Sequence, residues 1–110
     1  MDKARRKELQ EAYGQRKAPP GVFAVRGAGQ VWTATSRDLP QAQNRVWFSL
    51  RQGAFINREL QTLWNAQGEA SFTFEILEEI PTDNAAMIGL LLKEREADWR
   101  AELGARKLEG

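Results

Sequence analysis

The feature of this 110-residue chain that most restricts its fold is a pair of short apolar stretches separated by glycines, GVFAVRGAGQVWTATS, over residues 21–36. Its β-branched and aromatic residues favour strands. A two-residue Gly-X turn is typical of a hairpin. With the turn at Gly27 and Ala28, we expect Phe23 to lie directly opposite Trp32. The sequence therefore predicts a β-hairpin with an aromatic side chain on each strand.

The segment after the hairpin predicts two helices and another strand. Residues 36–53 can begin at an N-cap provided by Ser36 or Asp38, and a glycine ends the pattern. Residues 57–68 predict a shorter helix that starts at an asparagine and stops at a glycine. Large apolar and polar residues then alternate over residues 71–80, which indicates a strand.

Two further helices complete the predicted fold. The longest spans residues 82–103, and residues 2–17 form an N-terminal helix with a thin apolar stripe. Two prolines at positions 19 and 20 separate that helix from the hairpin. This order predicts an α+β fold, in which a small antiparallel sheet of about three strands is flanked by helices and an N-terminal helix is added.

We divide the chain into three parts on this basis. Residues 1–20 form a basic helix and a proline linker, residues 21–104 form the globular domain, and residues 105–110 form a C-terminal tail that we expect to fray. A chain of this length has room for one hydrophobic core.

Cysteine and histidine are both absent from the sequence. Their absence excludes disulfides, thiolate metal sites, and Ser-His or Cys-His catalysis. The N-terminus lacks an apolar segment of signal-peptide length, and no run of about 18 apolar residues occurs. We therefore expect a cytoplasmic protein without a membrane partner.

The charge is unevenly distributed along the chain. Residues 1–58 contain eleven Lys or Arg and four Asp or Glu, whereas residues 59–110 contain five and eleven. Such a chain can present a basic face to phosphates, or its charges can be spread over solvated helix faces. The residues expected to bind nucleic acid are Lys3, Arg5, Arg6, Lys7, Arg16 and Lys17 in the N-terminal arm, and Arg26, Arg37 and Arg51 in the domain.

The order of elements and several motifs resemble the GIY-YIG nuclease superfamily over roughly residues 21–103. The segment NRELQTLWNAQGEASFTFEILEEIP, residues 57–81, is similar to the family's Leu-Gln helix, its Asn-x-x-Gly stop and its Phe-x-Phe-Glu-x-Leu strand. The two short strands that give the family its name correspond to GVF at residues 21–23 and VWTA at residues 31–34. The resemblance implies the fold of a phosphodiester-cleaving endonuclease.

Most catalytic residues of the family are replaced in this sequence. The resemblance puts Phe23 and Trp32 at the positions of two tyrosines, and neither side chain can accept a proton. Ala34 replaces a glycine, Ala42 replaces an arginine that stabilises charge on the phosphate, and Val46 replaces a frequent histidine. We therefore expect a degenerate active site, and these replacements favour an inactive protein.

Two charged residues could preserve part of the site. Glu96 is followed three residues later by Trp99, which matches the spacing of the family's metal-binding glutamate and implies Mg²⁺ or Mn²⁺ as the cofactor. Arg45 lies one helical turn after Ala42 and could contact the phosphate in place of the missing arginine. The alternatives are a solvated glutamate and a solvent-facing arginine.

Three functions fit these residues. The sequence favours a catalytically degenerate nuclease-family domain that still binds nucleic acid, with DNA expected rather than RNA. The second is a weak Mg²⁺- or Mn²⁺-dependent endonuclease that uses Glu96 and Arg45. The third is a protein-interaction module or a homodimer, because four tryptophans and the apolar run MIGLLL at residues 87–92 can leave a hydrophobic helix surface exposed.

Overall fold

The computed structural model describes residues 19–81 and 85–109 of the chain. The helix predicted over residues 2–17 and the capping residues of the helix predicted to begin near residue 82 lie outside these ranges. The six basic residues of the N-terminal arm lie outside them as well; they are Lys3, Arg5, Arg6, Lys7, Arg16 and Lys17.

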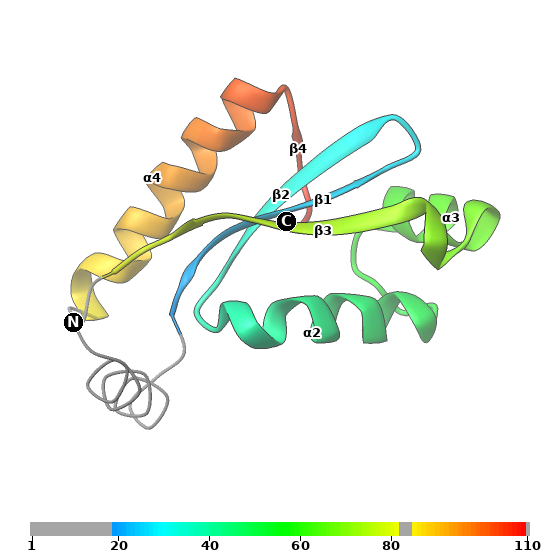
Figure 1. Ribbon diagram of the computed structural model, residues 1–110, viewed down its shortest axis with the longest axis horizontal. Helices are drawn as coiled ribbons and strands as arrows, with labels where there is room; N and C mark the ends of the chain where they lie inside the picture. The colour runs from blue at the N-terminus through cyan, green and yellow to red at the C-terminus, as the bar shows by residue number, and fades with distance from the viewer. Residues whose placement is uncertain (1–18, 82–84, 110) are drawn as a thin grey trace, which may run out of the picture.

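A four-stranded sheet with the order β3-β1-β2-β4 forms the centre of the domain (Figure 1). Strand β1 (Gly21–Gly27) pairs antiparallel with β2 (Gln30–Ser36) and with β3 (Phe72–Glu79). The short strand β4 (Arg106–Lys107) pairs in parallel with β2. The predicted α+β fold with a small sheet is confirmed, and the fourth strand makes the sheet mixed rather than antiparallel throughout.

Helices cover both faces of this sheet. Helices α2 (Leu39–Arg51) and α3 (Arg58–Gln67) lie on one face, and α4 (Ala85–Leu103) lies on the other (Figure 1). A short 3₁₀ turn (Glu69–Ser71) joins α3 to β3. Asp38 caps α2 as predicted, because its side chain accepts the N–H of Gln41. Within the described ranges, no helix is long and apolar enough to cross a membrane.

The hairpin turn lies one residue later than the sequence suggested. Its two central residues are Ala28 and Gly29, with φ angles of 55° and 73°. A tight hairpin turn of this kind needs positive φ at both positions, which glycine adopts without strain. Phe23 therefore pairs with Ala34, and the predicted pairing with Trp32 is wrong. The register changes by two residues, so Phe23 and Trp32 still lie on the same face of the sheet.

The main hydrophobic core fills the space between the sheet and helices α2 and α3. The rings of Trp47 and Trp64 meet edge to face at 5.2 Å, and Phe23 stacks on Phe74 at 4.8 Å. Such aromatic pairs add to the stabilisation that burial itself provides. A smaller cluster packs on the α4 side of the sheet and consists of Ile80, Ile88 and Leu92.

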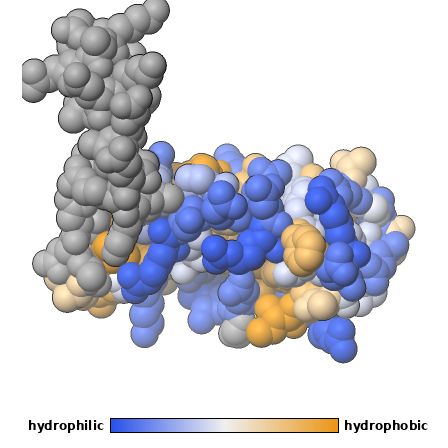
Figure 2. Space-filling view, turned by 90° about the horizontal axis from the view of Figure 1, so that it is seen from below, coloured by the Kyte–Doolittle hydropathy of each residue, from blue (hydrophilic) through white to orange (hydrophobic). Residues whose placement is uncertain are grey.

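Among the described residues, few large apolar side chains are exposed; they are Phe48, Ile56, Ile76, Met87 and Leu90. The outer surface below the sheet is mostly hydrophilic with separate hydrophobic spots (Figure 2). Met87 and Leu90 belong to the apolar run of α4, whereas three of the four tryptophans lie in the core. The apolar surface that suggested an interaction module is therefore reduced to a few side chains.

Residues 105–108 are fixed to the domain, in contrast to the fraying expected for residues 105–110. Leu108 is fully buried in the main core, and its N–H donates to the carbonyl of Thr33 at 2.9 Å. Arg106 forms an ion pair with Glu59 of α3 at 2.9 Å. Tertiary contacts thus give a strand to a segment whose two residues have little intrinsic preference for one.

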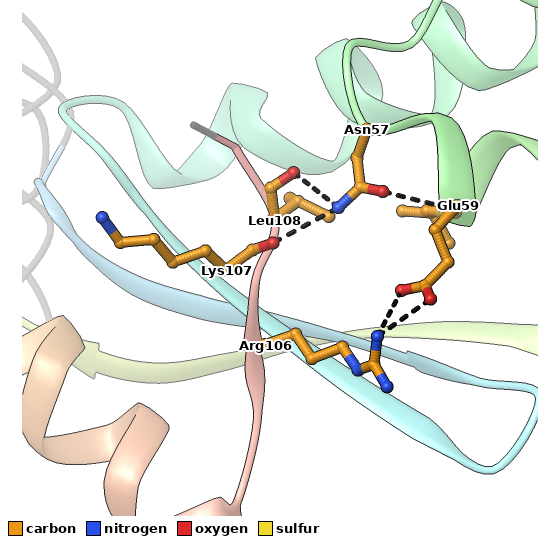
Figure 3. Close-up of polar contacts among 6 residues, drawn as sticks. Asn57, Glu59, Arg106, Lys107 and Leu108 are labelled. Carbon is orange, nitrogen blue, oxygen red and sulfur yellow. Dashed lines mark hydrogen bonds and ion pairs between the residues drawn. The ribbon is translucent and has the colours of Figure 1, made fainter.

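Asn57 joins the start of α3 to the end of β4 (Figure 3). Its Oδ1 accepts the N–H of Leu60 at 3.1 Å, which caps the helix. Its Nδ2 donates to the carbonyl oxygens of Lys107 and Leu108 at 3.2 and 3.1 Å. One side chain therefore satisfies backbone groups of two elements that lie about 50 residues apart.

Replacement of Asn57 by alanine removes the helix cap and both tethers of β4. We expect the free energy of unfolding to fall by about 1–3 kcal/mol, measured by urea denaturation. Asn57→Ser keeps a capping oxygen but is too short to reach both carbonyls, so its loss should be smaller. An alanine variant as stable as the wild type would contradict this role.

Candidate functional site

The five positions that the sequence resemblance assigned to the family's catalytic pattern lie together in the main core. They are Phe23, Trp32, Ala34, Ala42 and Val46. None is more than 8% exposed. They come from β1, β2 and the face of α2 that packs on the sheet. None of these five side chains can accept a proton.

The indole of Trp32 is fully buried, and its N–H has no hydrogen-bond acceptor within the described part of the chain. The side-chain oxygen of Gln30, two residues earlier on β2, is buried without a donor in the same way. An unsatisfied buried polar group costs about 1–3 kcal/mol. The packing of the Trp32 ring must outweigh this cost.

A groove with a volume of about 610 Å³ lies along the edge of β2 that β4 leaves uncovered. Strand β4 pairs only with Trp32 and Thr33, so the edge is open from Ala34 to Ser36. The walls of the groove come from β2, α2, α4 and the end of the chain. We call it the basic groove; its charged residues are Arg37, Arg45, Lys93, Glu96, Lys107 and Glu109.

The four basic side chains of this groove form no ion pair with any residue that the structure describes. Arg45 is exposed and lines the groove, while Ala42, one turn earlier on the same helix, is buried in the core. The groove thus combines the arginine and the glutamate that the sequence singled out, Arg45 and Glu96.

The other predicted basic residues of the domain behave differently. Arg37 lines the basic groove, but Arg26 pairs with Glu75 at 2.9 Å. Arg51 donates two hydrogen bonds to Glu69, each of 2.7 Å. These bonds hold the pKa of Glu69 below its ordinary value. Arg26 and Arg51 therefore have carboxylate partners within the fold.

Two basic residues of the groove, Lys93 and Lys107, were not predicted from the sequence. Lys93 lies three residues before Glu96, so helical spacing could have indicated that both point to one side of α4. Lys107 reaches the groove through the pairing of β4 with β2, for which the local sequence carries no signal.

Glu96 is buried beside β2, with only 8% of the residue exposed. Its Oε2 accepts a hydrogen bond of 2.6 Å from the hydroxyl of Thr33 and lies 3.7 Å from Nε of Arg100. Its Oε1 has no partner among the residues described here. Glu96 is thus held in one position by neighbouring groups, and the alternative of a freely solvated surface glutamate is wrong.

The oxygen atoms around Glu96 fit a divalent cation that is held through one carboxylate. Mg²⁺ takes oxygen ligands and commonly keeps several waters when it binds to one or two carboxylates and a substrate phosphate. The described residues contain no group of three or more acidic, histidine or cysteine side chains that could hold a metal ion alone. A cation at Glu96 would therefore depend on water and substrate oxygens.

Helix α4, which carries Glu96, is anchored on β3 by Glu78. Its Oε1 accepts hydrogen bonds from Nε1 of Trp99 at 2.9 Å and from Nε of Arg95 at 2.8 Å. The bond from Trp99, followed by that from Arg95, holds the pKa of Glu78 below its ordinary value of 4.5. Glu96 lines the groove, and Trp99, three residues later on the same helix, donates one of the hydrogen bonds that hold α4 on β3.

Trp99→Phe tests this anchor because it keeps an aromatic ring and removes the indole donor. The lowered pKa of Glu78 means that its carboxylate stabilises the fold above pH 4.5 and that this contribution is lost as pH falls below that value. In the variant we expect the pKa of Glu78 to rise towards 4.5, measured by NMR titration of its side-chain carboxyl.

The loss of stability between neutral pH and about pH 3 should therefore be smaller in Trp99→Phe than in the wild type. Asp98→Asn is the control, since Asp98 contacts Arg95 but donates nothing to Glu78. An unchanged Glu78 titration in Trp99→Phe would contradict the anchor.

No protein-family model matches this chain, and no curated protein matches it either. Among solved structures, the catalytic domain of the homing endonuclease I-TevI superposes with a TM-score of 0.68 at 26% identity. The match covers 82% of this chain and 96% of that domain.

A variant of the I-TevI catalytic domain with one glutamate replaced by alanine matches with a TM-score of 0.66 at 26% identity. It covers 78% of this chain and 84% of that one. Together these matches confirm the resemblance to the GIY-YIG nuclease superfamily that the sequence indicated.

Proposed function

We propose that this domain binds nucleic acid in the basic groove and has lost the catalytic activity of the fold. The observation that carries this proposal is the set of four basic side chains that line the groove without an ion pair to a described residue. Basic groups that contact phosphates supply most of the affinity of such interfaces. The similarity to the catalytic domain of a homing endonuclease supports DNA as the ligand rather than RNA.

A backbone donor at the edge of β2 supports the same proposal. The carbonyl of Thr33 accepts the N–H of Leu108, so the backbone groups of Thr33 point away from β1. Residues two apart in a strand direct their backbone groups to the same side. The N–H of Thr35 therefore points into the basic groove beyond the end of β4. Backbone N–H groups commonly contact phosphate oxygens and position a nucleic acid.

The proposed loss of catalysis follows from the side chains at the former catalytic positions. Hydrolysis of a phosphodiester needs a base for the attacking water, and a missing base costs about 10²–10⁴ in rate. Phe23 and Trp32 cannot act as that base. A missing donor for the developing charge costs about a further 10²–10³. Ala42 and Val46 have no such donor.

The double variant Arg45→Ala/Lys93→Ala removes two groove cations. We expect it to weaken DNA binding and to reduce the salt dependence of the affinity by about one phosphate contact per residue, measured by fluorescence anisotropy at roughly 50 and 200 mM salt. Arg26→Ala/Arg51→Ala is the matched control, because it removes two arginines that have ion-pair partners. Absence of binding at low salt, or an equal loss in the control, would overturn the proposal.

A weak metal-dependent endonuclease is the second candidate. It is supported by the presence of Glu96 and Arg45 in one groove. Mg²⁺ or Mn²⁺, when bound, would supply stabilisation of negative charge and a more acidic water. In this function Glu96 holds the cation, the hydroxyl of Thr33 orients the carboxylate, and Arg45 holds the phosphate by charge-assisted hydrogen bonds.

Glu96→Gln separates the two candidates because it keeps an acceptor for Thr33 and removes the charge that a cation needs. If the wild type cleaves DNA in the presence of Mg²⁺ or Mn²⁺, the variant should lose at least about 10² in rate while it still binds DNA. Glu109→Gln, which changes the other acidic residue of the groove, is the control. Cleavage that survives Glu96→Gln excludes this endonuclease. A wild type that cleaves no DNA supports the degenerate domain.

A further inference from the structure

We propose that the outer face of helix α2 binds unpaired bases, so that the ligand of this domain is single-stranded or locally unpaired nucleic acid. This inference rests on the proposed function, since the bases would belong to a strand whose phosphates lie in the basic groove.

The outer face of α2 carries a shallow hollow of about 410 Å³, lined by Gln41, Asn44, Arg45 and Phe48. Along α2 each residue of this set follows the previous one by three, one and three positions, so all four lie on one side of the helix. Arg45 lines both this hollow and the basic groove. The two depressions are therefore adjacent and share a cation.

Phe48 is the unusual member of this face because 61% of it is exposed. The other large apolar side chains of α2 point to the core, and they are Leu39, Val46, Trp47 and Leu50. An aromatic ring beside a cationic groove provides a platform on which a base can stack, and stacking tolerates any base because each has a π face. The core does not require the ring of Phe48, which is therefore available to stack on a base.

The polar residues around Phe48 complement an unpaired nucleotide. Arg45 has no ion-pair partner among the described residues, so its guanidinium can hold the phosphate next to a stacked base. The amides of Gln41 and Asn44 each provide donors and an acceptor for the edge of a base. Phosphate, ring and base edge would each meet a matching side chain within two turns of one helix.

The stacking of bases in a duplex and the size of the basic groove both favour an unpaired strand over a duplex. The bases of a duplex are stacked on each other, so their faces are closed to an aromatic side chain unless a base is extruded. The basic groove has the volume of a pocket that encloses a small ligand. A duplex resists bending, so a flexible single strand can follow a groove of this size more readily.

The test compares one labelled DNA sequence as a single strand and as a duplex, by anisotropy, with the full chain and its variants. We expect tighter binding of the single strand. Phe48→Ala should weaken that binding by about 5- to 150-fold without changing its salt dependence, because stacking involves no ion release. Phe48→Trp should retain it. Ile56→Ala is the matched control, since Ile56 is 69% exposed and lines neither depression.

The outcomes distinguish this inference from the proposed function. Equal or tighter binding of the duplex, or an unchanged affinity in Phe48→Ala, overturns base stacking while groove binding stands. Absence of binding to either DNA overturns both. Phe48 is exposed, so its variants should keep the circular dichroism and unfolding curve of the wild type.

Discussion

The rest of the structure depends on the burial of β1 on both of its faces. From Val22 to Val25 every side chain is at most 2% exposed, with alternate residues directed to α4 and to α2 with α3. A close neighbour fixes the strand at Gly27, because a Cβ there would collide with the ring of Phe72. A strand confined in this way sets the positions of β2 and β3, and through them the positions of all three described helices.

Much of this arrangement could be predicted from local sequence. Asp38 and Asn57 act as the N-caps that their side chains suggested, and Gly68 ends α3 with a positive φ. The hairpin was predicted with a wrong register because the run GAG offers two turns one residue apart. Strand β4 was not predicted, since its two charged residues are held by Asn57 and Glu59, which lie about 50 positions earlier.

Only the part of the candidate site that depends on local sequence was predicted. Glu96 was found because its spacing to Trp99 matches a local motif of the family that the sequence resembles, and Arg45 because it lies one turn from Ala42, where that family carries an arginine. The sequence could not show which basic residues have partners. Arg26 and Arg51 pair with carboxylates 49 and 18 residues away, whereas Lys107 comes to the groove from the far end of the chain. Charge counted along a chain therefore overstates the charge that a surface presents.

The burial of Ala42 limits the side chains that this position can accept. An arginine introduced there would have to bring its guanidinium into a closed apolar core, and an uncompensated buried charge costs several kcal/mol. A small domain has only about 5–15 kcal/mol of stability in total. An arginine at this position would thus weaken the fold before it could contribute any chemistry. The packing of this core therefore favours small apolar side chains at position 42.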